Sequence, residues 1–153
     1  MIQVKAKDIM TSEVITVKKD TPIEDIAKIL IEKRISGVVV VDDENKVVGV
    51  VSETDIVKKE KNIKVPSFIT ILQGVVFLDS IKEMEEDIKR VAAYKAEDIM
   101  SSDVLTVNEK DDLEYVANLM IEKSINRVPV VDDTKTLKGI ICRYDIIKSM
   151  FSR

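Results

Sequence analysis

The sequence of 153 residues contains no histidine and only one cysteine. Histidine is the commonest general base and the commonest metal ligand, so its absence excludes a Ser-His-Asp triad and histidine-based zinc sites. Because Cys142 has no partner in the chain, an internal disulfide is excluded and a reducing, cytoplasmic environment is expected. The first residues also lack the apolar core of a signal peptide, which favours the same location.

Long apolar runs and an excess of positive charge are missing as well. The mostly apolar residues 68–78 form a run of about 11, whereas a membrane-spanning helix takes about 20, so we expect no membrane span. The chain has 24 Lys and Arg against 28 Asp and Glu, a net charge of −4, whereas nucleic-acid binders usually carry a basic patch. We therefore expect no nucleic-acid partner. The content of 45% hydrophobic and 34% charged residues is typical of a globular domain.

The sequence repeats itself at a fixed spacing. Asp8-Ile9-Met10 recurs ninety residues later as Asp98-Ile99-Met100, and the same shift relates Gly49 to Gly139. Roughly two in five aligned positions are identical over about 55 residues, which is more than shared composition produces. We predict two copies, residues 1–60 and 94–153, joined by a linker of residues 61–93.

Each copy carries the same order of predicted elements. An extended stretch at residues 14–17 precedes Thr21-Pro22-Ile23-Glu24, in which Thr21 is a predicted N-cap and Glu24 completes a capping box. β-branched residues at 38–41 and 47–51 flank a polar turn and predict a hairpin, and a second helix is predicted from about residue 52 to 61. The fold class is therefore α+β, with β-α-β-β-α units repeated twice. About 60 residues bury too little surface alone, so the two copies should fold together.

The first helix of each copy is predicted to present one apolar face to a shared core. The positions fall at i, i+3, i+4, i+7 and i+8. They are Ile23, Ile26, Ala27, Leu30 and Ile31 in the first copy, and Leu113, Val116, Ala117, Met120 and Ile121 in the second.

The linker contains two further patterns. Ser80 and Glu83 form a capping-box pattern before Ile81, Met84, Ile88 and Val91, which predicts an amphipathic helix. The apolar residues 68–78 are interpreted first as a linker helix packed on the domain's own core. A dimer seam or a docking face for another protein is the alternative, because exposed apolar patches usually mark interfaces.

The motif with the clearest chemical meaning runs from Gly49 to Asp55 and recurs from Gly139 to Asp145. A glycine ends an apolar strand and permits close backbone approach, and Ser52 and Asp55 then open a helix. A helix start suits a phosphate, and a carboxylate can accept two hydrogen bonds from a ribose diol. Ser52-x-x-Asp55 is equally a plain helix cap. The second copy replaces the serine by Cys142 and keeps the aspartate, which indicates that the carboxylate does more than cap.

These motifs together resemble a known family. The tandem copies open with Asp-Ile-Met, contain Val-Val-Asp-Asp and end with Gly-h-h-(Ser/Cys)-x-x-Asp, where h is apolar, and they resemble a pair of CBS domains, also called a Bateman module. The resemblance implies two tandem CBS units packed as a pseudo-twofold pair, with residues 61–93 as an inserted helical linker. It also implies a stand-alone regulatory module that binds AMP, ADP, ATP or S-adenosylmethionine, with no prosthetic group, and that forms a homodimer through its helices.

The resemblance further implies two ligand clefts, each shared between the copies. One cleft would contain Val50, Ser52, Thr54, Asp55, Met100, Ile125, Asn126 and Arg127, and the other Ile140, Cys142, Arg143, Asp145, Met10, Ile35 and Ser36. Apolar side chains would enclose the purine, the aspartate would bind the ribose and the arginines would pair with phosphate. We expect the Asp55 cleft to bind better, because it keeps the Ser52 hydroxyl and gains Arg127. Arg127 is equally interpreted as a surface cation, and Met10 and Met100 as core fillers.

Three functions follow from this interpretation. The first is a non-enzymatic sensor that binds an adenine nucleotide, or cyclic di-AMP, and passes its state to an effector protein. The second is a ligand-free dimer or adaptor with degenerate clefts, which Glu53 and Cys142 favour. An enzyme is the least supported, because histidine is missing and Cys142 occupies the place of Ser52 in the other copy.

Overall fold

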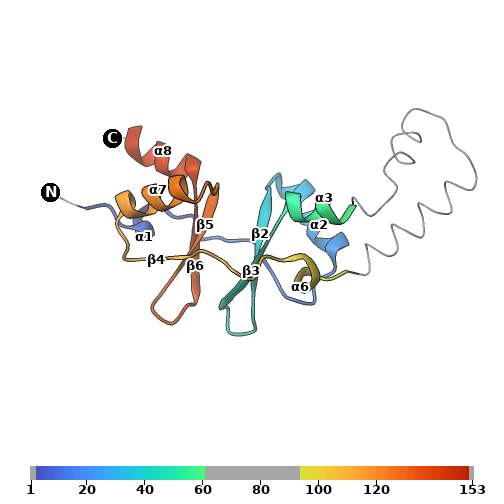
Figure 1. Cartoon of the computed structure of the whole chain (residues 1–153). Helices are drawn as coiled ribbons and strands as arrows, with labels where there is room; N and C mark the ends of the chain where they lie inside the picture. Colours follow the sequence, from blue (N-terminus) through green and yellow to red (C-terminus); the bar gives the residue numbers. More distant parts are fainter. Residues whose placement is uncertain (1–2, 61–93, 152–153) are drawn as a thin grey trace, which may run out of the picture. The chain divides into compact units, whose positions relative to one another are not determined.

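The computed structural model describes residues 3–60 and 94–151 (Figure 1). The predicted helical linker, residues 61–93, lies outside the described residues, and so do the apolar run at 68–78 and the predicted helix at 81–91. Across the described ranges, no helix is both long enough and apolar enough to cross a membrane.

The two copies fold into the same order of elements, as the repeat predicts. The first copy contains α1 (Ala6–Ile9), β1 (Thr16–Val17), α2 (Ile23–Lys33), β2 (Gly37–Val41), β3 (Val47–Ser52) and α3 (Glu53–Glu60). The second contains α6 (Ala96–Ile99), β4 (Val107–Asn108), α7 (Leu113–Glu122), β5 (Arg127–Val131), β6 (Leu137–Cys142) and α8 (Arg143–Phe151). The described strands form two three-stranded sheets, ordered β1-β2-β3 and β4-β5-β6, with β4 parallel and β6 antiparallel to β5. The predicted α+β class is confirmed.

The start of α2 differs from its prediction. Its N-cap is Pro22, which provides no side-chain hydrogen bond, so Thr21 is not the cap. The Thr21 hydroxyl instead accepts a hydrogen bond from the backbone N–H of Lys18 at 3.0 Å, and the Thr21 N–H donates back to the Lys18 carbonyl at 3.1 Å. The hydroxyl therefore closes the turn before the helix, and the predicted capping box was wrong.

The buried apolar face of α2, and that of α7 in the second copy, is narrower than predicted. Ile26 is fully buried, whereas Ile31 is 76% exposed. The second copy behaves in the same way, with Met120 1% exposed and Ile121 74% exposed. At about 100° per residue, positions i and i+8 differ by about 80° around the helix, so the last residue of the pattern turns away from the sheet. Its assignment to the core was wrong in both copies.

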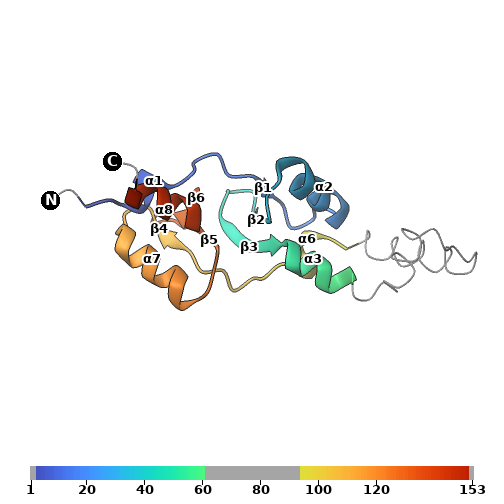
Figure 2. The same cartoon turned by 90° about the horizontal axis from the view of Figure 1, so that it is seen from above.

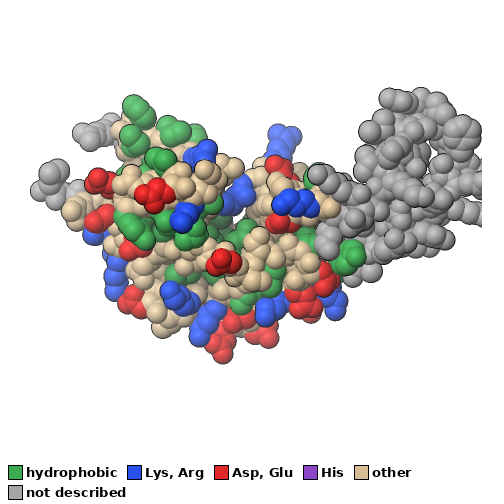
Figure 3. Space-filling model, viewed as in Figure 1, with side chains coloured by type: hydrophobic (Ala, Val, Ile, Leu, Met, Phe, Trp, Pro, Cys, Tyr) green, Lys and Arg blue, Asp and Glu red, His purple; other side chains and the backbone are tan. Residues whose placement is uncertain are grey.

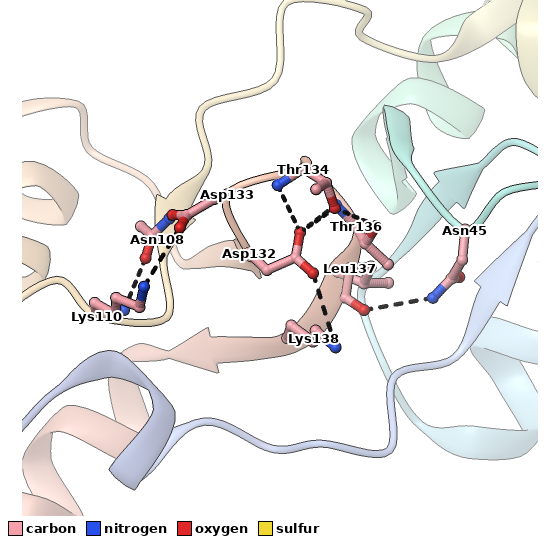
Figure 4. A network of polar contacts seen from close by, with 9 residues as sticks. All are labelled: Asn45, Asn108, Lys110, Asp132, Asp133, Thr134, Thr136, Leu137 and Lys138. Atoms are coloured by element: carbon pink, nitrogen blue, oxygen red, sulfur yellow. Dashed lines mark hydrogen bonds and ion pairs between the residues drawn. The ribbon is translucent and has the colours of Figure 1, made fainter.

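The hairpin turn of the second copy is held by an aspartate side chain (Figure 4). Asp132 Oδ1 accepts hydrogen bonds from the Thr134 N–H at 2.9 Å, the Thr134 hydroxyl at 2.7 Å and the Thr136 N–H at 3.0 Å. The hydroxyl bond from Thr134 is the main cause that lowers the pKa of Asp132. Asp42 makes the equivalent backbone bonds in the first copy, each at 2.9 Å. Both predicted polar turns are therefore present, and the side chain of the first aspartate in each turn accepts the hydrogen bonds that hold it.

The compact units of the structure interleave the two copies. Unit 1 comprises Met1–Thr16, Val41–Val48 and Asp103–Arg153, and unit 2 comprises Val17–Val40 and Gly49–Ser102. Each Asp-Ile-Met segment therefore belongs to the unit that holds the sheet of the other copy. The copy boundaries at residues 60 and 94 stay a prediction for the sequence repeat, and they do not coincide with these units.

In unit 1, the segment around α1 is bonded to the second copy. The N–H of Ala6 donates to the Asp111 carbonyl at 2.8 Å, and Thr11 and Ile140 exchange backbone hydrogen bonds at 2.9 and 3.0 Å. α1 lies beside β6 and α8 (Figure 2). Ala6 is fully buried in a core cluster made of Ala6, Val107, Val116, Met120, Val128, Val130 and Ile141. A residue near the start of the chain therefore completes the core of the second copy's sheet.

Unit 2 repeats this construction with α6. The N–H of Ala96 donates to the Thr21 carbonyl at 2.8 Å, and Val50 and Ser101 exchange backbone hydrogen bonds at 3.1 and 3.0 Å. Ala96 is fully buried, as Ala6 is. The same contacts thus recur at the repeat spacing.

The two strand glycines allow the methionine of each Asp-Ile-Met segment to approach closely. A Cβ atom added to Gly139 would lie 2.5 Å from Met10 Sδ and 2.9 Å from the backbone oxygen of Thr11. A Cβ on Gly49 would lie 2.5 Å from Met100 Sδ, and its nearest neighbours all belong to that side chain. The sequence predicted that each strand glycine permits close approach to the backbone, and in the structure a methionine side chain makes this approach.

This difference predicts unequal costs for two equivalent substitutions. Gly139→Ala is expected to lower the free energy of unfolding by about 1–3 kcal/mol, because the Thr11 backbone cannot move aside. Gly49→Ala should cost less, since the flexible Met100 side chain can take another rotamer. Urea unfolding of both variants measures the difference. A larger loss for Gly49→Ala would contradict this account of the packing.

Candidate functional site

The turn from β3 into α3 is closed by reciprocal hydrogen bonds between Ser52 and Asp55. The Ser52 N–H donates to Asp55 Oδ2 at 2.8 Å, and the Ser52 hydroxyl donates to the same oxygen at 3.0 Å. Ser52 Oγ also accepts a hydrogen bond from the Asp55 N–H at 3.3 Å, which completes a capping box. Among the described residues, nothing donates to Asp55 Oδ1, so this oxygen is left for a ligand.

The turn from β6 into α8 keeps one of these bonds. The Cys142 N–H donates to Asp145 Oδ2 at 2.8 Å. Asp145 therefore satisfies a helix-start N–H without any hydroxyl partner, and this bond alone accounts for an aspartate in both copies. The inference that its presence beside Cys142 indicates a further role stays a prediction. As in the first copy, Oδ1 has no donor within the described part of the chain.

Unit 2 contains five of the eight residues predicted for the Asp55 cleft, together with Ile35 and Ser36, which were predicted for the Asp145 cleft. Met100 lies against Gly49, and Val50 pairs with the residue that follows Met100. The Glu53 N–H donates to the Ser36 carbonyl at 2.9 Å, so the loop between α2 and β2 adjoins the start of α3. The predicted residues of this unit are Ile35, Ser36, Val50, Ser52, Thr54, Asp55 and Met100.

In unit 1 the structure gathers the remaining predicted residues. The Arg143 N–H donates to the Asn126 carbonyl at 3.1 Å, and Arg143 Nε donates to the Ile125 carbonyl at 3.2 Å. Arg127 is the register partner of Cys142 across β5 and β6. The predicted residues of this unit are Met10, Ile125, Asn126, Arg127, Ile140, Cys142, Arg143 and Asp145. The implied pairing of Asp55 with residues 125–127, and of Asp145 with residues 35–36, stays a prediction.

The thiol of Cys142 sits in an environment that keeps it protonated. Burial raises the pKa of the Cys142 thiol, the negative charge of Asp145 raises it further, and the positive charge of Arg127 opposes both. Because the thiolate is the reactive form, a raised pKa makes this cysteine a weak nucleophile at neutral pH. Within residues 3–60 and 94–151, no group of three or more acidic or cysteine side chains is placed to hold a metal ion.

A groove in unit 1 extends the site beyond the predicted residues. Its volume is about 790 Å³, and Asp145, Met10, Thr11, Asp8 and Lys148 are among the residues that line it. Small-molecule sites have volumes of about 300–1,000 Å³. Sequence reasoning missed Asp8, Thr11 and Lys148 as lining residues. The signal for Lys148 was its spacing, three residues after Asp145 on the same helix face.

Comparison with known proteins places this arrangement in a family. The family model of the CBS domain matches residues 6–62 and 96–152, which together make up more than half of the sequence. The chain belongs to the CBS domain family. The two matches have the spacing of the internal repeat, so the resemblance inferred from the motifs is confirmed.

Similar CBS proteins cover nearly the whole chain. The uncharacterized protein MJ1426 of Methanocaldococcus jannaschii is 32% identical over 151 residues, covering 94% of this chain and 89% of that protein. The crystal structure of CBSX2, a CBS-pair protein of Arabidopsis thaliana, in complex with AMP has a TM-score of 0.73 at 28% identity and covers 95% of each chain. The CBS domain pair of protein MJ0100, in complex with 5′-methylthioadenosine and S-adenosyl-L-methionine, has a TM-score of 0.69 at 28% identity and covers 97% of each chain.

Proposed function

We propose that this CBS pair is a non-enzymatic regulatory module that binds an adenosine compound and passes its state to a partner protein. The observation that carries the proposal is the repeated aspartate, Asp55 and Asp145, whose Oδ2 binds the backbone while Oδ1 is left without a donor among the described residues. A carboxylate oxygen fixed in this way can accept hydrogen bonds from a ribose diol. AMP, 5′-methylthioadenosine and S-adenosylmethionine, the molecules held by the similar structures, share adenine and ribose.

The apolar residues beside each aspartate support the adenine part of the proposal. In unit 1, Met10 lies against Gly139 and lines the same groove as Asp145, and Ile140 pairs with Thr11. In unit 2, Met100 lies against Gly49 and Val50 pairs with Ser101, on the strand that leads into Ser52 and Asp55. All four apolar side chains are partly buried, so they are accessible and held in place. An apolar surface beside a single ribose acceptor is the composition expected of a nucleoside site. Regulation then requires the ligand to bind one state of the protein more tightly than another.

The test is calorimetric titration with AMP, ATP, 5′-methylthioadenosine, S-adenosylmethionine and cyclic di-AMP. We compare Asp55→Asn and Asp145→Asn, with the exposed Glu122→Gln as a matched neutralisation elsewhere. Asparagine can keep the backbone hydrogen bond through its oxygen, but it presents an NH₂ group in place of Oδ1. One asparagine variant is expected to lose about tenfold or more in affinity, while Glu122→Gln binds like the wild type.

A second candidate, a ligand-free adaptor dimer, has support from α8. No residue of this helix is buried, and Tyr144, Ile147, Met150 and Phe151 are between 55% and 80% exposed. Figure 3 shows hydrophobic side chains gathered where α8 lies. Tyr144, Ile147 and Phe151 share one face, and a second copy of the chain presents the same face about a twofold axis. Absence of binding by all five ligands, together with a dimer mass in sedimentation, would favour this candidate over the sensor.

A further inference from the structure

The α1 segment, residues 3–11, forms one wall of the groove in unit 1. Residues 8–11 of the segment line the groove, and Asp145 and Lys148 are among the residues of α8 that line it as well. The helices α1 and α8 also contact each other, as Figure 2 shows. A ligand that fills the groove therefore contacts the α1 segment and α8 at the same time.

Backbone hydrogen bonds attach the segment on both sides of the wall that it forms. Near the start of α7, the Leu113 N–H donates to the Val4 carbonyl at 2.9 Å. Beyond the groove, Thr11 and Ile140 exchange hydrogen bonds at 2.9 and 3.0 Å, which places the segment along the edge of β6. The segment is thus attached to two elements of the second copy.

An ion pair strengthens the attachment near α7. Lys5 Nζ donates a hydrogen bond to Asp112 Oδ1. Asp112 is the N-cap residue of α7, yet its side chain makes no capping hydrogen bond. The equivalent residue in unit 2, Lys95, pairs with Pro22, which has no carboxylate. The carboxylate at the start of α7 therefore holds the α1 segment, and only unit 1 has this ion pair at the repeated position.

The segment buries far less side-chain surface than the sheet that it covers. Among residues 3–11, Ala6 alone is buried, and Ile9 and Met10 pack against the core while partly exposed. In β5, by contrast, every residue from Val128 to Val131 is buried. Regions with few buried apolar contacts open at a lower free energy than the core. The segment can therefore leave unit 1 while β5 and β6 stay paired with each other.

We propose that a ligand in this groove holds the α1 segment on unit 1, so that the ligand controls whether the segment is docked or released. This inference rests on the proposed function and adds the conformational change that reports the ligand. Release removes one wall of the groove, so the ligand binds the docked state and shifts the equilibrium towards it.

Release of the segment changes the surface that a partner protein meets. Ala6 leaves the core cluster, and the N–H and C=O groups of Ile140 lose their partners on Thr11. An open strand edge can bind an extended segment of another protein through backbone hydrogen bonds. The state of the groove is thereby passed to the edge of β6.

Hydrogen exchange of the full chain, measured by NMR, tests the first part of the proposal without ligand. The amides of Ala6 and Thr11 should exchange faster than those of β5. Ile140 should exchange together with them, because its N–H donates to Thr11. The N–H groups of a strand alternate between its two sides, so that of Ile141 faces β5 and should stay protected.

The second part is tested by adding AMP or 5′-methylthioadenosine at about a hundred times the Kd measured by calorimetry. The exchange of Ala6, Thr11 and Ile140 should slow by about a hundredfold, because release then requires loss of the ligand. The amide of Asn45, which donates to Asp42 in the hairpin turn, should be unchanged.

Two variants separate the attachment from the groove. Asp112→Asn removes the ion pair and should speed the exchange of Ala6 by about two- to fivefold in the free chain. The equivalent amide of Ala96 in unit 2 is the matched control and should be unchanged. In Asp145→Asn, the same ligand concentration should slow the exchange of Ala6 by about tenfold or less.

Three outcomes would overturn the proposal. The first is exchange of Ala6 and Thr11 that is no faster than that of β5 in the free chain. The second is a ligand that binds by calorimetry and leaves their exchange unchanged, in which case the proposed function still stands. The third is slowing in Asp145→Asn as large as in the wild type. Failure of the proposed function is distinct from these results, because then neither compound binds the wild-type chain by calorimetry.

Discussion

Replacing Met120 by alanine is expected to lower the free energy of unfolding by about 2–5 kcal/mol. Met120 is 1% exposed and belongs to the core cluster of unit 1, so truncation leaves a cavity among residues that cannot fully collapse. The next residue, Ile121, is 74% exposed and provides a control on the same helix. Ile121→Ala should change the free energy by less than about 0.5 kcal/mol.

Urea unfolding followed by far-ultraviolet circular dichroism measures both variants. The comparison separates burial from hydrophobicity, because the two residues are apolar neighbours in the sequence. A loss for Ile121→Ala as large as that for Met120→Ala would contradict the described orientation of α7. It would point instead to a partner that covers Ile121 in solution.

A carboxylate introduced at Ala6 is expected to destabilise the sheet of the other copy. Ala6 is fully buried within the same cluster as Val128, Val130 and Ile141. Ala6→Asp would place an unpaired charge there, at a cost of about 3–5 kcal/mol. Lys7→Asp, at an exposed neighbouring residue, should have little effect on stability.

Hydrogen exchange resolves where the damage of Ala6→Asp occurs. The amides of β5 and β6 should lose protection in the variant, although they lie more than a hundred residues away in sequence. Lys7→Asp should keep their protection. If β5 and β6 stayed protected while β2 and β3 opened, the assignment of α1 to unit 1 would be wrong.

The repeat and its elements could be predicted from the sequence because each depends on local pattern. Alternation of apolar residues and the Asp42 and Asp132 turns are local signals, and the hairpins follow them. The exposure of Ile31 was missed because the width of the buried face depends on how the helix lies on its sheet. The role of Thr21 was missed because a threonine hydroxyl can either cap a helix or close the turn before it. That α1 packs on the sheet of the other copy was expected only from the family resemblance. The pattern alone cannot decide this, because the Asp-Ile-Met segments of the two copies are identical and fit either sheet.

The candidate site was predictable in part for the same reason. The repeated motif identified Asp55 and Asp145, but not that one oxygen of each binds the backbone. Asp8 and Thr11 come from the first segment of unit 1 and Lys148 from its last helix, and only the folded chain brings them to one groove. The charge contrast between Glu53 and Arg143 was visible in the sequence, whereas the hydrogen bond that fixes Arg143 was not.

The exchange of Asp-Ile-Met segments also constrains how the chain can reach its folded state. The bond from Ala6 to Asp111 closes a loop of more than a hundred residues, so unit 1 cannot complete its core while only the first copy has been synthesised. Contacts this distant in sequence slow folding, because the entropy of closing the loop is lost before the contacts stabilise it. A newly made first copy carries an unused α1 and a sheet still waiting for α6. Each of two such incomplete chains can dock its α1, the repeat equivalent of α6, on the sheet of the other, which makes segment exchange between molecules the natural competitor of correct folding.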